Sequence, residues 1–387
     1  MTPAARYAAA IDILDKVLRG EAAEKALTHW ARANRFAGSG DRHALRDIVF
    51  DVLRCKRSYG VRGGAKTGRG LVLGALRAAG IAPDDVFTGQ GYGPAALTDA
   101  DGPGAQPEGL DALDCPDWLA PALLASLGDN FPAVMQTLQS RAPVFLRVNL
   151  RKGDMARAVA ALALDGIETQ PNPLSPTALE VLNNPRKVQT SNAYLDGLVE
   201  LQDAASQAIV DELSLRSGQR VLDFCAGGGG KSLAMAAQTS AQFFAHDIAP
   251  ARMKDLPARA KRAGVQVTVL ASAALAKAEP FDLVLADAPC SGSGSWRRAP
   301  EAKWALSQAR LTELCALQAQ IMDNAAALVA KGGTLAYATC ALLKMENQDQ
   351  ITAFLGRHSG WTLKKARVLT PLEGGDGFFI ACLKRKI

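Results

Sequence analysis

Two cysteines follow predicted strands in the C-terminal half of the chain. Cys290 comes after the apolar run 283–286 and after Asp287, and Cys340 follows the apolar run 333–338. Ligands collect at the carboxyl ends of strands in open α/β sheets. A lone cysteine is often a small buried filler. Two cysteines at strand ends, one of them beside an acid, indicate a working site instead.

Two thiols and an acid fit methyl transfer to a pyrimidine carbon better than hydride transfer, which needs no thiol. Carbon 5 of cytosine is a poor nucleophile until something adds to carbon 6. A thiolate can add at carbon 6, after which carbon 5 can attack a methyl sulfonium. A base must then remove the proton at carbon 5 so that the thiol can leave. Two cysteines next to one carboxyl group match these steps.

A glycine-rich turn, Cys225–Lys231, follows the predicted strand 220–224 and leads into a helix. Glycines let the backbone approach a ligand closely, and a helix N-terminus attracts negative charge. The run Gly230–Ser232 looks like the end of a phosphate-binding loop, but that motif needs glycine where Cys225 stands, so a nucleoside-triphosphate site is excluded. Asp247 ends the next strand and can hold ribose hydroxyls, as an acid does in nicotinamide and S-adenosylmethionine folds alike.

Strands and helices alternate from Ser206 onward, which predicts a doubly wound parallel sheet. The strands are expected over residues 220–224, 242–245, 265–270, 283–286, 333–338 and 378–384. The intervening helices are expected over residues 231–238, 251–263 and 309–330.

The preceding part of the chain is expected to be helical over residues 4–60, a linker over 80–112 and helical again near 117–127 and 131–139. A small α+β unit follows over residues 144–202. Its first strand carries Arg147 and Asn149, which either face nucleic acid or are the exposed alternation of an edge strand. We favour the edge strand.

The composition limits the kinds of protein that this chain can be. The 48% of hydrophobic residues and the lack of an apolar run of membrane-spanning length predict a soluble globular protein. Seven cysteines without CxxC pairs fit a reduced cytoplasm, and we expect no metal site. The net charge of +6 permits a polyanionic partner without requiring one. Residues 61–70 mix glycine with arginine and lysine, which suits either a mobile loop on phosphates or a solvated basic face.

Several longer motifs carry a family resemblance. They are Asp287-Ala-Pro-Cys290-Ser-Gly-Ser-Gly, Arg297-Arg298-Ala-Pro, Lys303-Trp304, Tyr337-Ala-Thr-Cys340, Glu346-Asn347, Gly377-Phe378-Phe379 and Leu201-Gln202-Asp203 with Ser206-Gln207. Through them the C-terminal half resembles the Nop/Sun family of RNA cytosine-5 methyltransferases. The N-terminal runs Gly40-Asp41-Arg42 and Asp47-Ile48-Val49-Phe50 resemble the antitermination-factor-like RNA-binding domain of the bacterial ribosomal RNA methyltransferase B branch.

The resemblance implies an α/β fold with a Rossmann-like class I methyltransferase domain over residues 205–387. A small α+β, RNA-recognition-like subdomain over 141–204 would precede it. A linker with helices over 81–140 and an all-helical RNA-binding domain over 1–80 would come first. The implied activity is S-adenosylmethionine-dependent methylation of carbon 5 of a cytosine in RNA, ribosomal RNA in particular. We expect a cytoplasmic monomer that binds RNA and no membrane.

The resemblance also implies roles for single residues. Cys340 would be the nucleophile on carbon 6, Cys290 would assist proton removal and release, and Asp287 and Lys231 would hold the cytosine. Trp296–Arg298 would form an RNA-facing edge. The cofactor would be bound by Cys225, Ala226, Gly227, Gly228, Gly229, Gly230, Lys231, Asp247 and Asp287.

The chain departs from the family pattern at the cofactor site. Gly227-Gly228 replace the usual Ala-Pro, so we expect a looser loop, and residues 271–273 lack the usual adenine-side acid. Two other functions therefore stay open: a non-catalytic RNA-binding ribosome assembly factor and a small-molecule methyltransferase. The intact Asp287, Cys290 and Cys340 argue against the first. The second would leave the basic N-terminal helices without a role.

Overall fold

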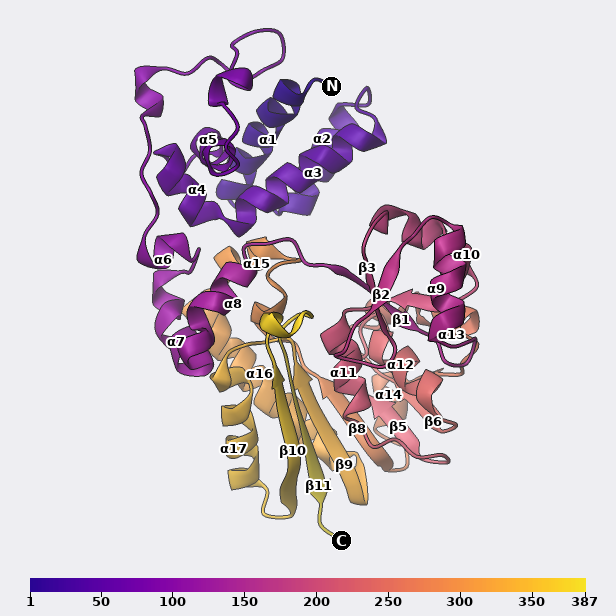
Figure 1. Ribbon diagram of the computed structural model, residues 1–387. Helices are drawn as coiled ribbons and strands as arrows, with labels where there is room; N and C mark the ends of the chain where they lie inside the picture. Colours follow the sequence, from indigo (N-terminus) through magenta and orange to yellow (C-terminus); the bar gives the residue numbers. More distant parts are fainter. The chain divides into compact units, whose positions relative to one another are not determined.

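The computed structural model describes residues 1–387, which form two compact units (Figure 1). The first unit comprises residues 1–141 together with 296–306, and the second comprises 142–295 with 307–387. Residues 296–306, which we expected inside the methyltransferase domain, thus belong to the helical N-terminal unit. The other expected domain boundaries remain predictions. No helix is long and apolar enough to cross a membrane.

Five helices build the first unit, and their apolar faces share one core. The helices are α1 (Pro3–Leu18), α2 (Ala23–Ala33), α3 (Ser39–Arg54), α4 (Lys56–Gly63) and α5 (Gly68–Ala78). The core includes Ile13, Leu14, Leu45, Leu53 and Leu71, all almost fully buried. The expected helical character of residues 4–60 is confirmed.

For residues 61–70 the sequence left a mobile loop and a solvated basic face open, and the structure shows the end of α4, an exposed turn over residues 64–67 and the start of α5. The two helices pack with their backbones in contact. A Cβ atom on Gly63 would lie 1.7 Å from the carbonyl oxygen of Gly70, and one on Gly74 would lie 1.9 Å from that of Tyr59. Only glycine permits this approach. The glycines of this stretch therefore serve helix packing.

The segment that we expected to be a linker is largely irregular, but it is packed. Val86 and Phe87 lie in the core of the helical unit, and Arg69 pairs with Asp101 at 2.7 Å. Its short elements are η1 (Pro83–Asp85), η2 (Asp99–Asp101), α6 (Gly109–Ala112), η3 (Asp117–Leu119), α7 (Ala120–Leu127), η4 (Gly128–Asn130) and α8 (Phe131–Thr137).

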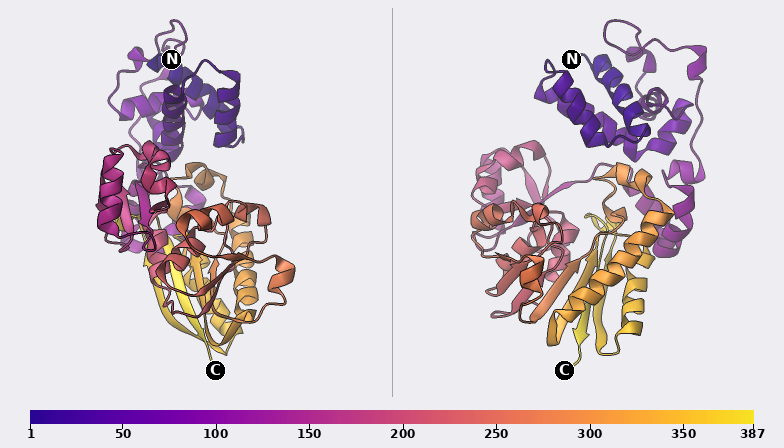
Figure 2. Two further views of the ribbon diagram at one scale, coloured as in Figure 1. Left: turned by 90° about the vertical axis from the view of Figure 1, so that its right-hand side faces the viewer. Right: turned by 180° about the vertical axis from the view of Figure 1, so that it is seen from behind.

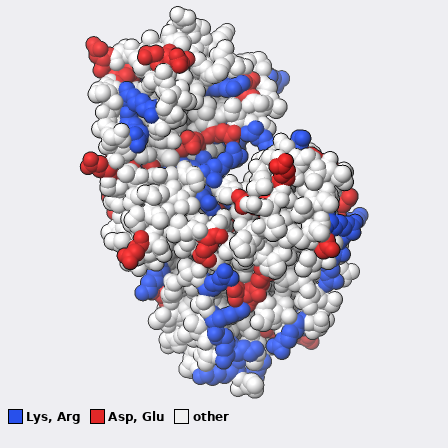
Figure 3. Space-filling view, viewed as in Figure 1, with Lys and Arg blue, Asp and Glu red and all other residues white.

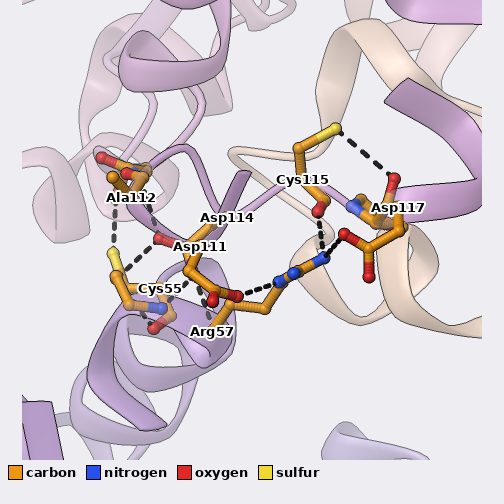
Figure 4. Close-up of polar contacts among 10 residues, drawn as sticks. Cys55, Arg57, Asp111, Ala112, Asp114, Cys115 and Asp117 are labelled. Carbon is orange, nitrogen blue, oxygen red and sulfur yellow. Dashed lines mark hydrogen bonds and ion pairs between the residues drawn. The ribbon is translucent and has the colours of Figure 1, made fainter. Parts of the chain in front are cut away.

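Asp114 connects this segment to the start of α4 through hydrogen bonds. Its carboxylate is fully buried and accepts hydrogen bonds from the backbone amides of Arg57 and Ser58 at 2.7 and 3.0 Å. It also accepts from the Ser58 hydroxyl and from Gln139. Figure 4 shows Arg57 reaching Asp111, Asp117 and the Cys115 carbonyl beside it.

Residues 296–306 supply hydrogen-bond donors to carbonyl groups at the C-terminal end of α3. The last carbonyl groups of a helix have no partner inside the helix. Here Lys303 Nζ donates to the Arg54 carbonyl at 3.1 Å and Trp304 Nε1 donates to the Leu53 carbonyl at 2.6 Å. Arg54 Nε in turn donates to the Arg297 carbonyl at 2.7 Å. These bonds fix the short helix α15 (Pro300–Ala305) against α3.

The expectation that Trp296–Arg298 form an RNA-facing edge is wrong for its first two residues. Trp296 and Arg297 are buried, and only Arg298 is exposed. A tryptophan in a Ser/Gly-rich loop suggested exposure, but its ring instead supplies apolar surface to the interior.

The second unit begins with a four-stranded antiparallel sheet in the order β2-β3-β1-β4. Its elements are β1 (Val144–Val148), α9 (Met155–Leu164), β2 (Thr169–Pro171), β3 (Ala178–Val181), η5 (Pro185–Thr190), α10 (Asn192–Leu195) and β4 (Val199–Leu201). The preference for an exposed edge strand at Arg147 and Asn149 is wrong. β1 lies inside the sheet, and both side chains are buried.

A seven-stranded sheet in the order β10-β11-β9-β8-β5-β6-β7 forms the rest of the unit. Its parallel strands are β5 (Arg220–Asp223), β6 (Gln242–Ala245), β7 (Thr268–Val269), β8 (Phe281–Asp287) and β9 (Val329–Thr339). The antiparallel strands are β10 (Trp361–Leu369), which we did not expect, and β11 (Phe378–Arg385). The predicted doubly wound sheet is confirmed.

Helices cover both faces of this sheet (Figure 2). Val221, Leu283 and Leu285 point to the face covered by α11 (Ala204–Asp211) and α12 (Gly230–Gln238). Their neighbours along the strands point to the other face, which α16 (Gln308–Ala327) and α17 (Gln348–Arg357) cover. This alternation is the period-two pattern of a strand buried on both sides. The remaining elements are η6 (Pro250–Met253), α13 (Leu256–Ala263), α14 (Ser272–Leu275), η7 (Ser293–Ser295), η8 (Lys344–Glu346) and η9 (Pro371–Glu373).

Asp114→Gly should destabilise the helical unit by at least about 2 kcal/mol, because buried donors that lose their acceptor cost roughly 1–3 kcal/mol each. Glycine suits the positive φ of 48° at this position, so backbone strain does not contribute. Thermal unfolding measures the effect. Asp117→Ala is the control, since that carboxyl side chain is 74% exposed and its pairing with Arg57 adds little. Equal melting temperatures for the two variants would contradict the assigned role of Asp114.

Candidate active site

A cavity of about 390 Å³ opens at the carboxyl ends of β5 and β8, within the second unit. It is lined by Gln202, Ser206, Asp223, Cys225, Ala226, Gly227, Gly228, Gly230, Lys231, Arg252, Asp287, Ala288, Pro289, Cys290 and Cys340. The structure therefore brings together all the site residues proposed from the sequence except Gly229 and Asp247, which lie beside the cavity without lining it.

The two cysteines meet at this cavity. Parallel pairing places Asp287 of β8 beside Ala338 of β9, so the turns after the two strands run side by side. The Sγ atoms of Cys290 and Cys340 lie 3.3 Å apart, and both side chains are half-buried.

This contact shifts the pKa values of the two thiols in opposite directions. The hydrogen bond that the Cys290 thiol donates lowers the pKa of Cys340, and the ammonium group of Lys231 also lowers it, although burial and Asp287 act against this shift. The same hydrogen bond raises the pKa of Cys290 well above its usual value, and burial and the charge on Cys340 add to the increase. Of the two thiols, Cys340 therefore loses its proton more readily and Cys290 less readily.

Lys231 and Asp287 form an ion pair at the cavity wall. Lys231 Nζ donates to Asp287 Oδ2 at 2.7 Å and lies 4.9 Å from the centre of the Phe378 ring. Burial alone would lower the pKa of Lys231, but the charge and hydrogen bond of Asp287 raise it overall. The amine therefore stays protonated next to Cys340.

Glu346 and Asn347 hold the turns that carry the cysteines. Glu346, fully buried at the end of η8, accepts from the Ser291 amide at 2.8 Å and from Gln318 at 3.0 Å. Burial raises its pKa. Asn347 accepts from the Thr339 hydroxyl at 2.5 Å and donates to the Ala341 carbonyl at 2.8 Å. One short segment thus fixes the turn after each catalytic-site strand.

Two glycines add a close backbone contact between the turns. The Gly294 amide donates to the Cys340 carbonyl, and the Gly377 amide donates to the Gly294 carbonyl, each at 2.9 Å. A Cβ atom on Gly294 would lie 2.2 Å from the Gly377 carbonyl oxygen. Any side chain on Gly294 would collide with the backbone of Gly377, in the turn before β11.

The glycine-rich loop is folded around left-handed glycines. Gly227 and Gly229 have φ values of +52° and +80°. A Cβ atom on Gly229 would lie 2.3 Å from the side chain of Leu256. The loop therefore needs glycine both for its backbone conformation and for its close packing.

Asp247 supports this loop directly. Its Oδ2 accepts from the Gly227 amide at 2.9 Å and from Arg252 at 3.1 Å, and its Oδ1 accepts from the Ala249 amide at 2.9 Å. The side chain is only 1% exposed. The structure thus assigns Asp247 a loop-holding contact, and its expected role on a ribose stays a prediction.

The sequence analysis did not propose Asp223 and Arg252 as site residues, although both line the cavity. Asp223 is fully buried, and Ser232 donates to its Oδ2 at 2.6 Å, whereas its Oδ1 has no hydrogen-bond partner. Burial raises its pKa to about 7. Its position at the end of the first predicted strand was the available signal. Arg252 gave none beyond its closeness to Asp247 in the chain.

Comparisons with known proteins agree with this arrangement. The family model described as 16S rRNA methyltransferase RsmB/F matches residues 210–384, and that of the RsmF/B-like ferredoxin-like domain matches 115–189. Ribosomal RNA small subunit methyltransferase B of Photorhabdus laumondii is 32% identical over 285 residues, and that of Citrobacter koseri is 34% identical over the same length. Each alignment covers 70% of this chain and 66% of the relative.

Solved structures share the fold. The crystal structure of PH0851 matches with a TM-score of 0.77 and 23% identity over 100% of this chain and 99% of that chain. A methyltransferase homologue from Pyrococcus horikoshii matches with a TM-score of 0.63 and 24% identity over 71% of this chain and 97% of that chain. At these identities the likeness concerns the fold alone. The two family models together span well over half of the chain, and the chain therefore belongs to the RsmB/F family of methyltransferases.

Proposed function

We propose that this protein transfers a methyl group from S-adenosylmethionine to carbon 5 of a cytosine in RNA, ribosomal RNA in particular, through a covalent cysteine–cytosine adduct. The contact between Cys290 and Cys340 at 3.3 Å, beside the Lys231–Asp287 pair, carries the proposal. The curated relatives support ribosomal RNA as the substrate, since they are ribosomal RNA small subunit methyltransferases.

The residues at the cavity fit S-adenosylmethionine. The cavity is within the size range of small-molecule sites. The glycine loop lets the backbone approach a ligand, and the unpartnered Oδ1 of Asp223 can accept from an ammonium or hydroxyl group. Gly227, Gly228 and Gly230 would contact the cofactor from one side, and Asp287 would do so from the other. When bound, the cofactor supplies an electrophilic methyl group.

Cys340 would begin the reaction. Its sulfur adds to carbon 6 of the cytosine, and the electrons of the 5,6 double bond become available at carbon 5, which then takes the methyl group. A carboxylate accepts from the exocyclic amine of cytosine, as Asp287 would do here. The protonated Lys231 beside it offsets the negative charge that develops on the ring during thiolate addition.

Cys290 would end the reaction. The charge on Cys340 is one of the causes that raise the Cys290 pKa, and this charge disappears when the Cys340 sulfur bonds to carbon. Cys290 can then give its thiol proton to water at the open cavity, and the resulting thiolate accepts the proton from carbon 5. The C6–S bond breaks as the double bond re-forms, and the methylated base leaves.

RNA as the substrate class is consistent with the charge of the protein. The chain carries 44 Lys and Arg residues against 38 Asp and Glu. On the face that Figure 3 shows, Lys and Arg are spread among Asp and Glu and gather toward the lower end. Contacts from Lys and Arg to phosphates would supply free energy for unstacking the target base, which costs roughly a few kcal/mol.

Alkylation of the protein without RNA should reveal the difference between the thiols. Iodoacetamide at neutral pH should modify Cys340 before Cys290, because the pKa of Cys340 is lowered and that of Cys290 is raised. In Cys290→Ala the midpoint for Cys340 modification should move to higher pH, since the hydrogen-bond donor is gone. Peptide mass spectrometry reads both sites, with the fully buried Cys115 as the slow internal control. Faster modification of Cys290 would reverse the assignment.

The covalent step predicts opposite results for the two cysteine variants. Cys290→Ala should accumulate a protein–RNA adduct that survives a denaturing gel, because the adduct forms but release is blocked. Cys340→Ala should form no adduct, as should the double variant. Adduct formation by Cys340→Ala alone would make Cys290 the nucleophile. A lack of adduct in every variant, with unaltered RNA binding, would favour the non-catalytic assembly factor.

A further inference from the structure

Two arginines outside the cavity hold the carbonyl groups of the glycine loop. Arg147, on β1 of the four-stranded sheet, donates from Nη1 to the Gly230 carbonyl at 2.9 Å. Arg259, on α13, donates from Nη1 to the Gly228 carbonyl. The two guanidinium groups come from different elements, and they donate hydrogen bonds to two carbonyl groups of the same loop, two residues apart.

A buried carboxylate pairs with Arg259 and faces Arg147 across two neighbouring strands. Glu200 of β4 is buried and lies opposite Arg147 in the register of β1 and β4. It pairs with Arg259 at 3.5 Å and with Arg262 at 2.7 Å. Arg147 is buried as well and donates a second bond to Gln202, which lines the cavity. Buried charges are retained only when they are paired and hydrogen-bonded, and these contacts provide both.

The loop needs such support because of its composition. Residues 227–230 are four consecutive glycines, and each can adopt many backbone conformations when the loop is free. A flexible loop must be ordered when a ligand binds, which weakens affinity unless the loop is already held in the bound conformation. Hydrogen bonds from a guanidinium to fixed carbonyl groups are stronger than those of neutral donors.

We propose that Arg147 and Arg259 are positioning residues that hold the glycine loop in the conformation that binds S-adenosylmethionine. The inference rests on the proposed function for the identity of the ligand. It makes the small antiparallel sheet, through Arg147 and Glu200, a part of the cofactor site, although no residue of β1 lines the cavity. It also explains how an all-glycine loop keeps a defined shape in this chain.

Calorimetry with S-adenosylmethionine on the full chain tests the role of Arg259. Arg259→Met should weaken binding about tenfold, the effect expected for loss of one charge-assisted hydrogen bond. Arg262→Met is the matched control, since Arg262 lies on the same helix and pairs with the same Glu200 but has no bond to the loop. It should change affinity less than twofold. Equal affinities for the two variants would overturn the proposal.

The role of Arg147 is tested by comparing Arg147→Lys with Arg147→Met. A conservative variant is included because Arg147 is buried and a large change there can impair folding. Arg147→Lys should retain part of the affinity that Arg147→Met loses. Amide hydrogen exchange without cofactor should rise over residues 226–232 in Arg147→Met and Arg259→Met, while the melting temperature of Arg259→Met stays unchanged. Unaltered exchange in the loop would overturn the proposal even if the wild-type protein bound no cofactor. Absence of wild-type binding alone would count against the proposed function instead.

Gly228→Ala provides a rescue test. A Cβ atom on Gly228 would lie 3.2 Å from Arg259 Nη1, so alanine crowds the guanidinium in the wild-type protein. Methionine at position 259 removes that crowding, and alanine restricts the loop backbone. Without cofactor, the loop amides of the double variant should therefore exchange more slowly than those of Arg259→Met, whereas Gly228→Ala alone should not slow exchange relative to the wild type. Exchange in the double variant as fast as in Arg259→Met would show that Arg259 does not act by ordering the loop.

Discussion

The 3.3 Å contact between the Cys290 and Cys340 sulfurs is the interaction on which the rest of the site depends. Two isolated buried thiols would both be protonated at neutral pH, because burial disfavours the charged form. Side by side, one thiol donates to the other, and the pKa of Cys340 is lowered while that of Cys290 is raised. The protonated Lys231 reinforces this difference from the opposite side. The sheet makes the contact possible, since β8 and β9 are adjacent parallel strands that end together.

Much of the surrounding structure keeps that contact in place. Glu346 and Asn347 hold the two turns through buried hydrogen bonds, and Gly294 brings the backbones within reach of each other. The turn after Cys290 continues into residues 296–306, which complete the C-terminal end of α3 in the helical unit. The segment that follows the Cys290 turn in the sequence thus belongs to the helical unit.

The sequence predicted the parts of the fold that rest on local pattern. Alternating strands and helices indicated the doubly wound sheet, and cysteines after two strands indicated the site, because residues at parallel strand ends must gather at one edge. Residues 61–70 could not be assigned from the sequence, because the role of their glycines in helix packing depends on which helix they contact. Arg147 misled because its exposure depends on which strands flank β1. Arg259 gave no signal, since its partner is a backbone carbonyl that no sequence pattern marks.

Bisulfite sequencing of small-subunit ribosomal RNA, treated with purified protein and S-adenosylmethionine, tests the central claim most directly. The account predicts at least one cytosine that resists conversion in the complete reaction and converts when the cofactor is omitted or when Cys340→Ala replaces the wild-type protein. Complete conversion of every cytosine, in RNA that has nonetheless gained a methyl group elsewhere, would contradict it.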